Sequence, residues 1–183
     1  LIFNYTVAEG HVSSDLAYES TSALALNSGT INDAAGNSAT LTLASPGASN
    51  SLSNSKALVI DGVVPTVSNV TSTTNDGTYK LGDAVAITIS FSETMTVTGT
   101  PQLTLETGSS DAVVNYASGS GSSTLTFNYS IGAGEASSDL DYSSTSALAL
   151  NSGTIKDGAG NAATLTLASP GQSGSLGANK ALV

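Results

Sequence analysis

The sequence contains no cysteine, no tryptophan and no arginine, and only 10% of its 183 residues are charged. The lack of cysteine excludes disulfide staples and thiol nucleophiles, and the single histidine, His11, leaves few ways to build a nucleophile–base pair. Four lysines face fourteen acidic residues, for a net charge of −10. This balance argues against nucleic acid and against an anionic membrane surface as partners, because both are bound through excess positive charge.

Long apolar runs are also absent. None approaches the ~18 consecutive apolar residues that a membrane-spanning helix needs, so we expect no direct membrane insertion. Hydrophobic residues nevertheless make up 39% of the chain, which is enough to form a core and unlike the composition of a disordered segment.

The most informative feature that is present is an internal repeat. Residues Leu1–Val59 recur as Leu125–Val183 at an offset of 124, with 42 of 59 paired positions identical. A solenoid repeats every 20 to 50 residues, whereas a period of this length matches an independently folding domain. The copy starts in mid-unit, so we expect residues 1–60 to be the C-terminal half of one repeat, residues 61–183 to be a complete repeat, and the parent chain to be longer.

Alternating apolar and polar residues dominate the local pattern, as in Val85–Phe91, Leu125–Ile131 and Leu165–Leu167. A period of two is that of a half-buried strand, and the segments are separated by turn sequences such as Asn75-Asp76-Gly77 and Gly119-Ser120-Gly121. We count about seven to nine strands per repeat and predict an all-β chain of tandem immunoglobulin-like antiparallel β-sandwich repeats. The only helical candidate is a short segment, Ser144–Leu150, which fits a single turn or an irregular strand equally well.

The predicted boundary lies in Lys56–Thr66. There an apolar strand ends, Asp61-Gly62 supplies a turn, and Pro65 removes a ladder donor at the start of the next strand. The linker is short and contains a proline, so we expect neighbouring repeats to be restricted relative to one another.

Several motifs occur in an order that resembles the bacterial Ig-like repeats of giant cell-surface proteins. They are Ile60–Val67, Asp76–Asp83, Phe91-Ser92-Glu93 and Asp157-Gly158-Ala159-Gly160-Asn161. Such repeats are found in large adhesins and in the swimming-motility surface protein of cyanobacteria. The resemblance covers both the complete and the partial repeat. It implies an extracellular, mechanically extended array, often with calcium, and supplies no catalytic site.

Calcium requires six to eight oxygen ligands, and a domain junction offers candidates for them. We expect Asp61 from the linker to join Asp33 and Asn37 from the preceding loop, with Asp83 and Glu93 as further ligands. Asp157 and Asn161, the second copy of the loop pair, are expected to meet the linker of a following repeat. The alternative is that each Asp–Asn pair closes its own tight turn through hydrogen bonds and needs no metal.

Three functional hypotheses follow. The first is a non-enzymatic spacer of an extracellular or cell-surface protein, whose partners are neighbouring repeats of the same chain and whose junctions are stiffened by calcium. The second is a subunit of an extracellular filament, in which the half unit exposes strand edges that another copy of the chain completes. The third is a carbohydrate-binding module, which lacks support because such modules present aromatic platforms and this chain has no tryptophan.

Overall fold

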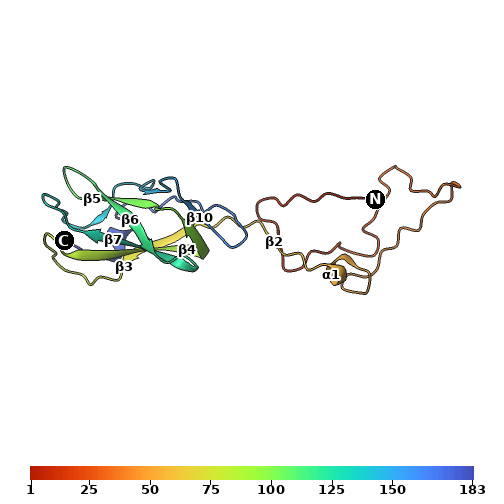
Figure 1. Cartoon of the computed structure of the whole chain (residues 1–183), viewed down its shortest axis with the longest axis horizontal. Helices are drawn as coiled ribbons and strands as arrows, with labels where there is room; N and C mark the ends of the chain where they lie inside the picture. Colours follow the sequence, from red (N-terminus) through yellow and green to blue (C-terminus); the bar gives the residue numbers. More distant parts are fainter. The chain divides into compact units, whose positions relative to one another are not determined.

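The computed structural model describes all residues from Leu1 to Val183 and is mostly β, with 33% of residues in strands and 4% in helices. The expected all-β class is confirmed. The chain divides into two compact units, which we call unit 1 (Leu1–Val63) and unit 2 (Val64–Val183) (Figure 1). The division falls three residues beyond the boundary expected at Ile60/Asp61.

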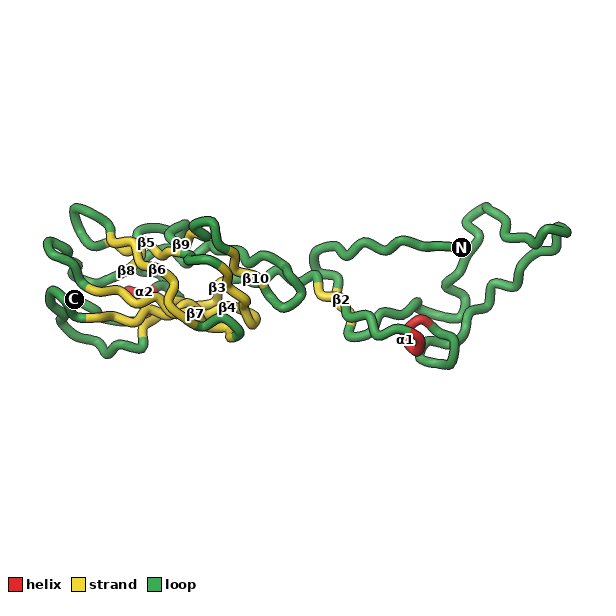
Figure 2. Tube along the Cα trace, in the orientation of Figure 1, coloured by secondary structure: helices red, strands yellow, loops and turns green.

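Unit 2 contains eight strands, within the expected seven to nine, and all the pairings between them are antiparallel (Figure 2). The strand order is β10-β4-β7-β6-β5-β8, with β3 also paired to β4 and β9 to β5. The strands are β3 (Val67–Ser72), β4 (Ala84–Thr98), β5 (Gln102–Glu106), β6 (Ala112–Ser118), β7 (Ser122–Ser130), β8 (Asp141–Tyr142), β9 (Leu148–Ala149) and β10 (Thr154–Lys156).

Strand β4 is the central strand of the fold, and its alternation of apolar and polar residues is the strongest in the sequence. Val85, Ile87, Ile89 and Phe91 are each no more than 4% exposed, as period-two burial requires. The first part of β4 lies between β3 and β7, whereas its last residues pair with β10 after a register shift beyond Ser90. One strand therefore serves two ladders, and the sheet curls around the buried face.

The hydrophobic core belongs to unit 2. All twenty buried hydrophobic side chains of the chain lie between Val70 and Leu182. Nine come from the segment before Leu125 and eleven from Leu125 onward. The core is therefore built jointly by the two halves of the complete repeat, which we call the front half (Val64–Thr124) and the back half (Leu125–Val183).

Much of the back half is irregular, and one sequence-based expectation fails there. The only helical candidate, Ser144–Leu150, contains the short strand β9, which is one of the two alternatives left open for it. The actual helix, α2 (Leu176–Asn179), lies elsewhere and is capped by Ser175, whose hydroxyl accepts from Ala178 N at 3.2 Å. The alternating Leu165–Leu167 segment lies in no regular strand, although Leu167 is buried.

Unit 1 has little regular structure. It contains β1 (Val12–Ser13) paired to β2 (Ile60–Asp61) and the helix α1 (Leu52–Ser55), which is capped by Ser51 as α2 is capped by Ser175. None of its hydrophobic side chains is fully buried, and Leu1, Ile2 and Phe3 are at least 76% exposed. No helix in the chain has the length and apolar character required to cross a bilayer.

Candidate functional site

The Asp157–Asn161 loop of unit 2 is closed by hydrogen bonds to one carboxylate. Asp157 Oδ1 accepts from Gly160 N at 2.7 Å and from Asn161 N at 2.8 Å, and Asn161 Nδ2 donates to Asp157 Oδ2 at 2.8 Å. Glycine is required at position 160 because its φ is +98°. This is the self-closed turn that the sequence left open as the alternative to a metal site.

The protonation of Asp157 is set by the same contacts. Burial would by itself raise the pKa of this carboxyl, but the side-chain and backbone donors of Asn161, with those of Gly160 and Ala159, outweigh burial and lower the pKa. The side chain is therefore held as a carboxylate at neutral pH. Its Oδ1 accepts two hydrogen bonds and its Oδ2 accepts one, so a lone pair that a cation can approach remains on Oδ2.

A second carboxylate lies close to this loop. A carboxylate oxygen of Glu93, on β4, lies within 4.8 Å of one of Asp157. Two carboxylates and the Asn161 amide oxygen are ligand types that calcium accepts, although they alone are fewer than the six it needs.

The position of this cluster in unit 2 corrects the expected arrangement. Thr164 N donates to Pro65 O at 2.8 Å and Thr66 bridges Thr164, so the loop that precedes Thr164 lies where the chain enters unit 2. Val183, by contrast, bonds to Gly77 at the far end of β3. Asp157 and Asn161 therefore lie near the start of their own repeat, and the prediction that they face a following linker is wrong.

Asp83 is not part of the cluster. It directly precedes β4, accepts from Lys80 N at 3.0 Å, and is ten residues before Glu93, which is in β4. That separation is roughly 30 Å at the rise of a β-strand, so the two residues do not ligate the same ion.

The remaining predicted ligands belong to unit 1. Asp33 Oδ1 accepts from Ala35 N at 2.9 Å and from Asn37 N at 2.8 Å, and Asn37 Nδ2 donates to Asp33 Oδ2 at 2.8 Å, which repeats the geometry of the unit 2 loop. Donation by Asn37, first from its side chain, lowers the pKa of Asp33. Asp61 is in β2 and accepts from Val63 N at 3.1 Å.

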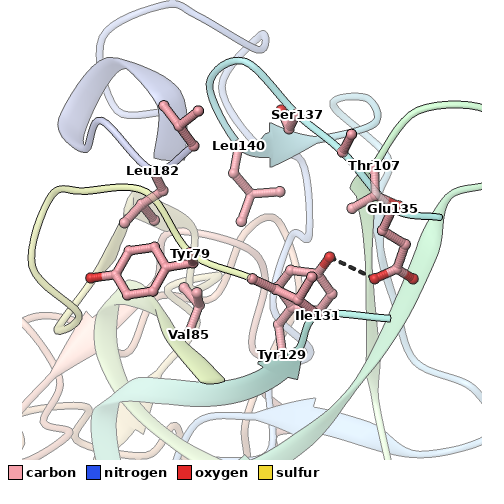
Figure 3. A pocket seen from close by; sticks show the side chains of 11 residues that line it. Tyr79, Val85, Thr107, Tyr129, Ile131, Glu135, Ser137, Leu140 and Leu182 are labelled. Carbon is pink, nitrogen blue, oxygen red and sulfur yellow. Dashed lines mark hydrogen bonds between the residues drawn. The ribbon is translucent and has the colours of Figure 1, made fainter. Parts of the chain in front are cut away.

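A largely apolar pocket opens at the Val183 end of unit 2 (Figure 3). On its wall the Tyr129 hydroxyl donates to Glu135 Oε2 at 2.7 Å, and Gly132 N donates to the same oxygen at 2.6 Å. Burial, then the bond to Glu135 and its charge, raise the pKa of Tyr129. Tyr129 is therefore buried in the pocket wall rather than presented as a platform for a sugar ring, whereas Tyr79, the other tyrosine of the pocket, is partly exposed.

The residue of unit 1 that corresponds to Glu135 is His11, the single histidine of the chain. It is exposed, but its Nδ1 lies 2.7 Å from the Tyr5 hydroxyl and 3.3 Å from Ala8 N. The histidine thus takes the place of Glu135 in the same small network, a role that the pairing of positions 11 and 135 could have indicated.

No protein-family model, curated protein or solved structure matches this chain. The likeness to bacterial Ig-like repeats accordingly depends on the order of motifs in the sequence.

Proposed function

We propose that this chain is a non-enzymatic spacer from a large extracellular bacterial surface or adhesin-type protein, in which Ig-like β-sandwich repeats carry a functional end away from the cell. The observation that carries the proposal is the combination of unit 2 with the repeat. Unit 2 closes its own core with eight strands, and a copy of its back half precedes it in the sequence at an offset of 124 residues. A self-contained unit in a repeating sequence adds length.

The linker is suited to this role because little of it is unattached. Ile60 pairs with Ser13, and Gly62 donates to His11 O and accepts from Gly10 N, both at 2.8 Å. On the other side Pro65 is held by Thr164. Only Val63 and Val64 separate these attachments, too few residues to act as a flexible tether.

The test of the spacer is length. Chains that carry one, two and three copies of residues 61–183 are compared by small-angle scattering. We expect the maximum dimension to rise by a constant increment with each copy, since linked units with short connections extend. Growth that levels off as copies are added would show collapse of the array and refute the proposal.

Calcium binding is the second part of the proposal. The Glu93 and Asp157 carboxylates lie together at the entry end of unit 2, and Asp61 is the acidic residue nearest in sequence before that end. We propose that these three carboxylates hold a calcium ion that stiffens the connection. Chelation is then expected to shorten the multi-copy chains.

Calorimetric titration of calcium separates ligands from bystanders. Glu93→Gln and Asp61→Asn are each expected to weaken binding by at least about tenfold, because each removes a charged oxygen ligand. Asp83→Asn is the matched control and should bind as the wild type does, since Asp83 lies at the other end of β4. Absence of calcium-dependent heat in the wild type, or equal losses in all three variants, would reject the metal and leave the spacer function standing.

One observation favours a second function, a filament subunit assembled by complementation between half domains. Unit 1 leaves exposed the side chains whose counterparts form the core of unit 2, for example Phe3 at 76% against Phe127 at 0%. Concentration-dependent polymerisation of the wild-type chain would support this function, and a single monomeric species at all concentrations would exclude it.

A further inference from the structure

Strands β6 and β7 of unit 2 pair over only part of their length. Their ladder ends at the pair Tyr116–Phe127 and does not continue toward the start of β6. From there residues 112–115 pair with β5, whereas residues 128–130 stay paired with β4. The two strands therefore separate, and a largely polar groove opens between them. It is lined by residues 111–117, residues 128–130 and Glu135.

Main-chain groups on both walls of this groove have no ladder partner. Along a paired strand, successive residues direct their N–H and C=O groups to opposite sides. On β6, Tyr116 N donates to Pro101 O at 2.8 Å, so the even-numbered residues face β5 and Val113 faces the groove. Just after β7, Ile131 N donates to the backbone before β4 at 3.1 Å, so the odd-numbered residues face β4 and Ser130 faces the groove. Val113 and Ser130 thus offer two donors and two acceptors.

Neither wall carries the residues with which natural edge strands avoid pairing with another chain. Such edges are usually blunted by lysine, by proline or by a bulge. The wall segments 112–116 and 127–130 contain neither lysine nor proline, and the register shift of β6 lies between Tyr116 and Ser118, at the closed end of the groove. The open end can therefore accept an extended peptide backbone, as other sheet edges do.

The charge of the groove indicates which kind of peptide fits. Asp111, before β6, and Glu135, after β7, lie toward the open end, and neither forms an ion pair. The Tyr129 hydroxyl and Gly132 N both donate to Glu135 Oε2, which leaves Oε1 free to bind a cation (Figure 3). None of the four lysines lines the groove, and the chain has a net charge of −10. A second copy of this acidic chain is therefore repelled, whereas a lysine-bearing segment is attracted.

We propose that the β6–β7 groove binds an extended, lysine-bearing segment of a different protein, which adds as a strand along the groove. Main-chain bonds to Val113 or Ser130 set the register of the segment, and its ammonium groups lie against Asp111 and Glu135. All these groups belong to unit 2, so the site depends neither on unit 1 nor on the spacer function or calcium.

The probe is the hexapeptide acetyl-KTVTKT-amide, titrated into the isotopically labelled wild-type chain and followed by hydrogen exchange in NMR spectra. In the free protein we expect the Val113 and Ser130 amides to exchange rapidly, because neither donates a hydrogen bond. At saturation the exchange of at least one of them should slow by about tenfold or more, because a main-chain hydrogen bond must open before exchange.

N-methylated forms of the peptide separate strand pairing from charge attraction. Methyl groups on alternate residues remove the N–H donors from one side of the extended peptide and keep both lysines. Two forms, methylated in opposite phases, therefore test the two sides. At least one form should bind at least about tenfold more weakly than the parent peptide, because its donors toward the groove are lost. Equal affinity of all three peptides would overturn the strand pairing.

Variants of the protein test the charges at low ionic strength, where screening is weak. Asp111→Asn and Glu135→Gln should each weaken peptide binding by about two- to fivefold, the effect of an exposed ion pair. Asp139→Asn is the matched control, because Asp139 is an exposed carboxylate of unit 2 outside the groove. It should change the affinity less than either groove variant does. Asp111 makes no hydrogen bond through its side chain, so Asp111→Asn tests charge without disturbing the fold.

Four further results would overturn the proposal. The first is unchanged exchange of both groove amides at a saturating peptide concentration, and the second is an equal effect of Asp111→Asn and Asp139→Asn. The third is slowed exchange with cellotetraose but not with the peptide, which would show a saccharide site. The fourth is slowed exchange at high protein concentration without peptide, which would show that a second copy occupies the groove. None of these results bears on the length increment of the spacer or on the heat of calcium binding, so the proposals fail separately.

Discussion

The two copies of the repeat offer a matched pair of substitutions, Phe127→Ala and Phe3→Ala. Phe127 is fully buried, pairs with Ile87 across the β4–β7 ladder and meets the Tyr116 ring edge-on at 6.0 Å between centroids. Removing a buried phenylalanine side chain costs about 3–5 kcal/mol, because the transfer free energy is lost and a cavity remains. Phe3 has the same sequence neighbours except that Ile2 replaces Thr126, but it is 76% exposed, so its replacement should change stability by no more than about 0.5 kcal/mol.

Unit 2 spans about 120 residues, for which each kcal/mol lowers the melting temperature by roughly 3–5 °C. Calorimetry should therefore show a loss of roughly 10–20 °C for Phe127→Ala and a change near zero for Phe3→Ala. Urea unfolding should give the same order with an unchanged m-value for Phe3→Ala. Equal shifts in the two variants would show that residues 1–7 are buried in solution and would refute the assignment of the core to unit 2.

Two further predictions concern unit 2. Hydrogen bonding lowers the folded-state pKa of Asp157, so the unfolded state binds more protons, and stability is lost as the pH falls from about 5 through the folded pKa. The urea midpoint of Asp157→Asn, measured against pH, should lack this part of the acid dependence. An Asp157→Asn profile identical to that of the wild type would contradict the prediction. At the β6–β7 hairpin, Gly119→Ala should destabilise unit 2 by at least about 2 kcal/mol, because φ is +112° and a Cβ would overlap Thr124 O. Gly121→Ala, where φ is +87° and the space around the Cβ is open, should cost about 1 kcal/mol. Equal costs of the two variants in urea unfolding would show that the hairpin shifts to relieve the overlap.

Sequence reasoning succeeded where one local pattern decided the structure. Val85–Phe91 alternates without interruption and is paired on both sides, so period and burial agree. Sequence reasoning failed where a contact between residues far apart in the sequence decided the structure. The segment Leu165–Leu167 alternates just as clearly, yet its ladder bonds are isolated ones, to Thr145 and, through the preceding Thr164, to Pro65.

The candidate metal site shows the same limit. The Asp–Asn loops could be recognised from their spacing, because an aspartate closing a turn on the residue four positions later is a local event. Which end of the unit the loop occupies depends on how residues 65–66 meet residue 164, about 100 positions away. No local pattern encodes that meeting, and the predicted pairing of Asp157 with a following linker was wrong for this reason.

The segment Leu1–Tyr5, which forms no strand although its copy in unit 2 does, shows best what strand formation requires in this chain. Leu125-Thr126-Phe127-Asn128-Tyr129 lies in β7, whereas Leu1-Ile2-Phe3-Asn4-Tyr5 lies in no strand and is exposed throughout. The two segments differ by one residue, and Ile2 has a higher strand propensity than most residues. Since strand propensity is no lower in Leu1–Tyr5, we attribute the difference to the β4 edge, which covers Leu125–Tyr129 and not Leu1–Tyr5. A β-strand has no hydrogen-bond partner within itself, so the front half acts as the template for β7, and any edge of the same sequence presented to Leu1–Tyr5 should convert that segment into a strand as well.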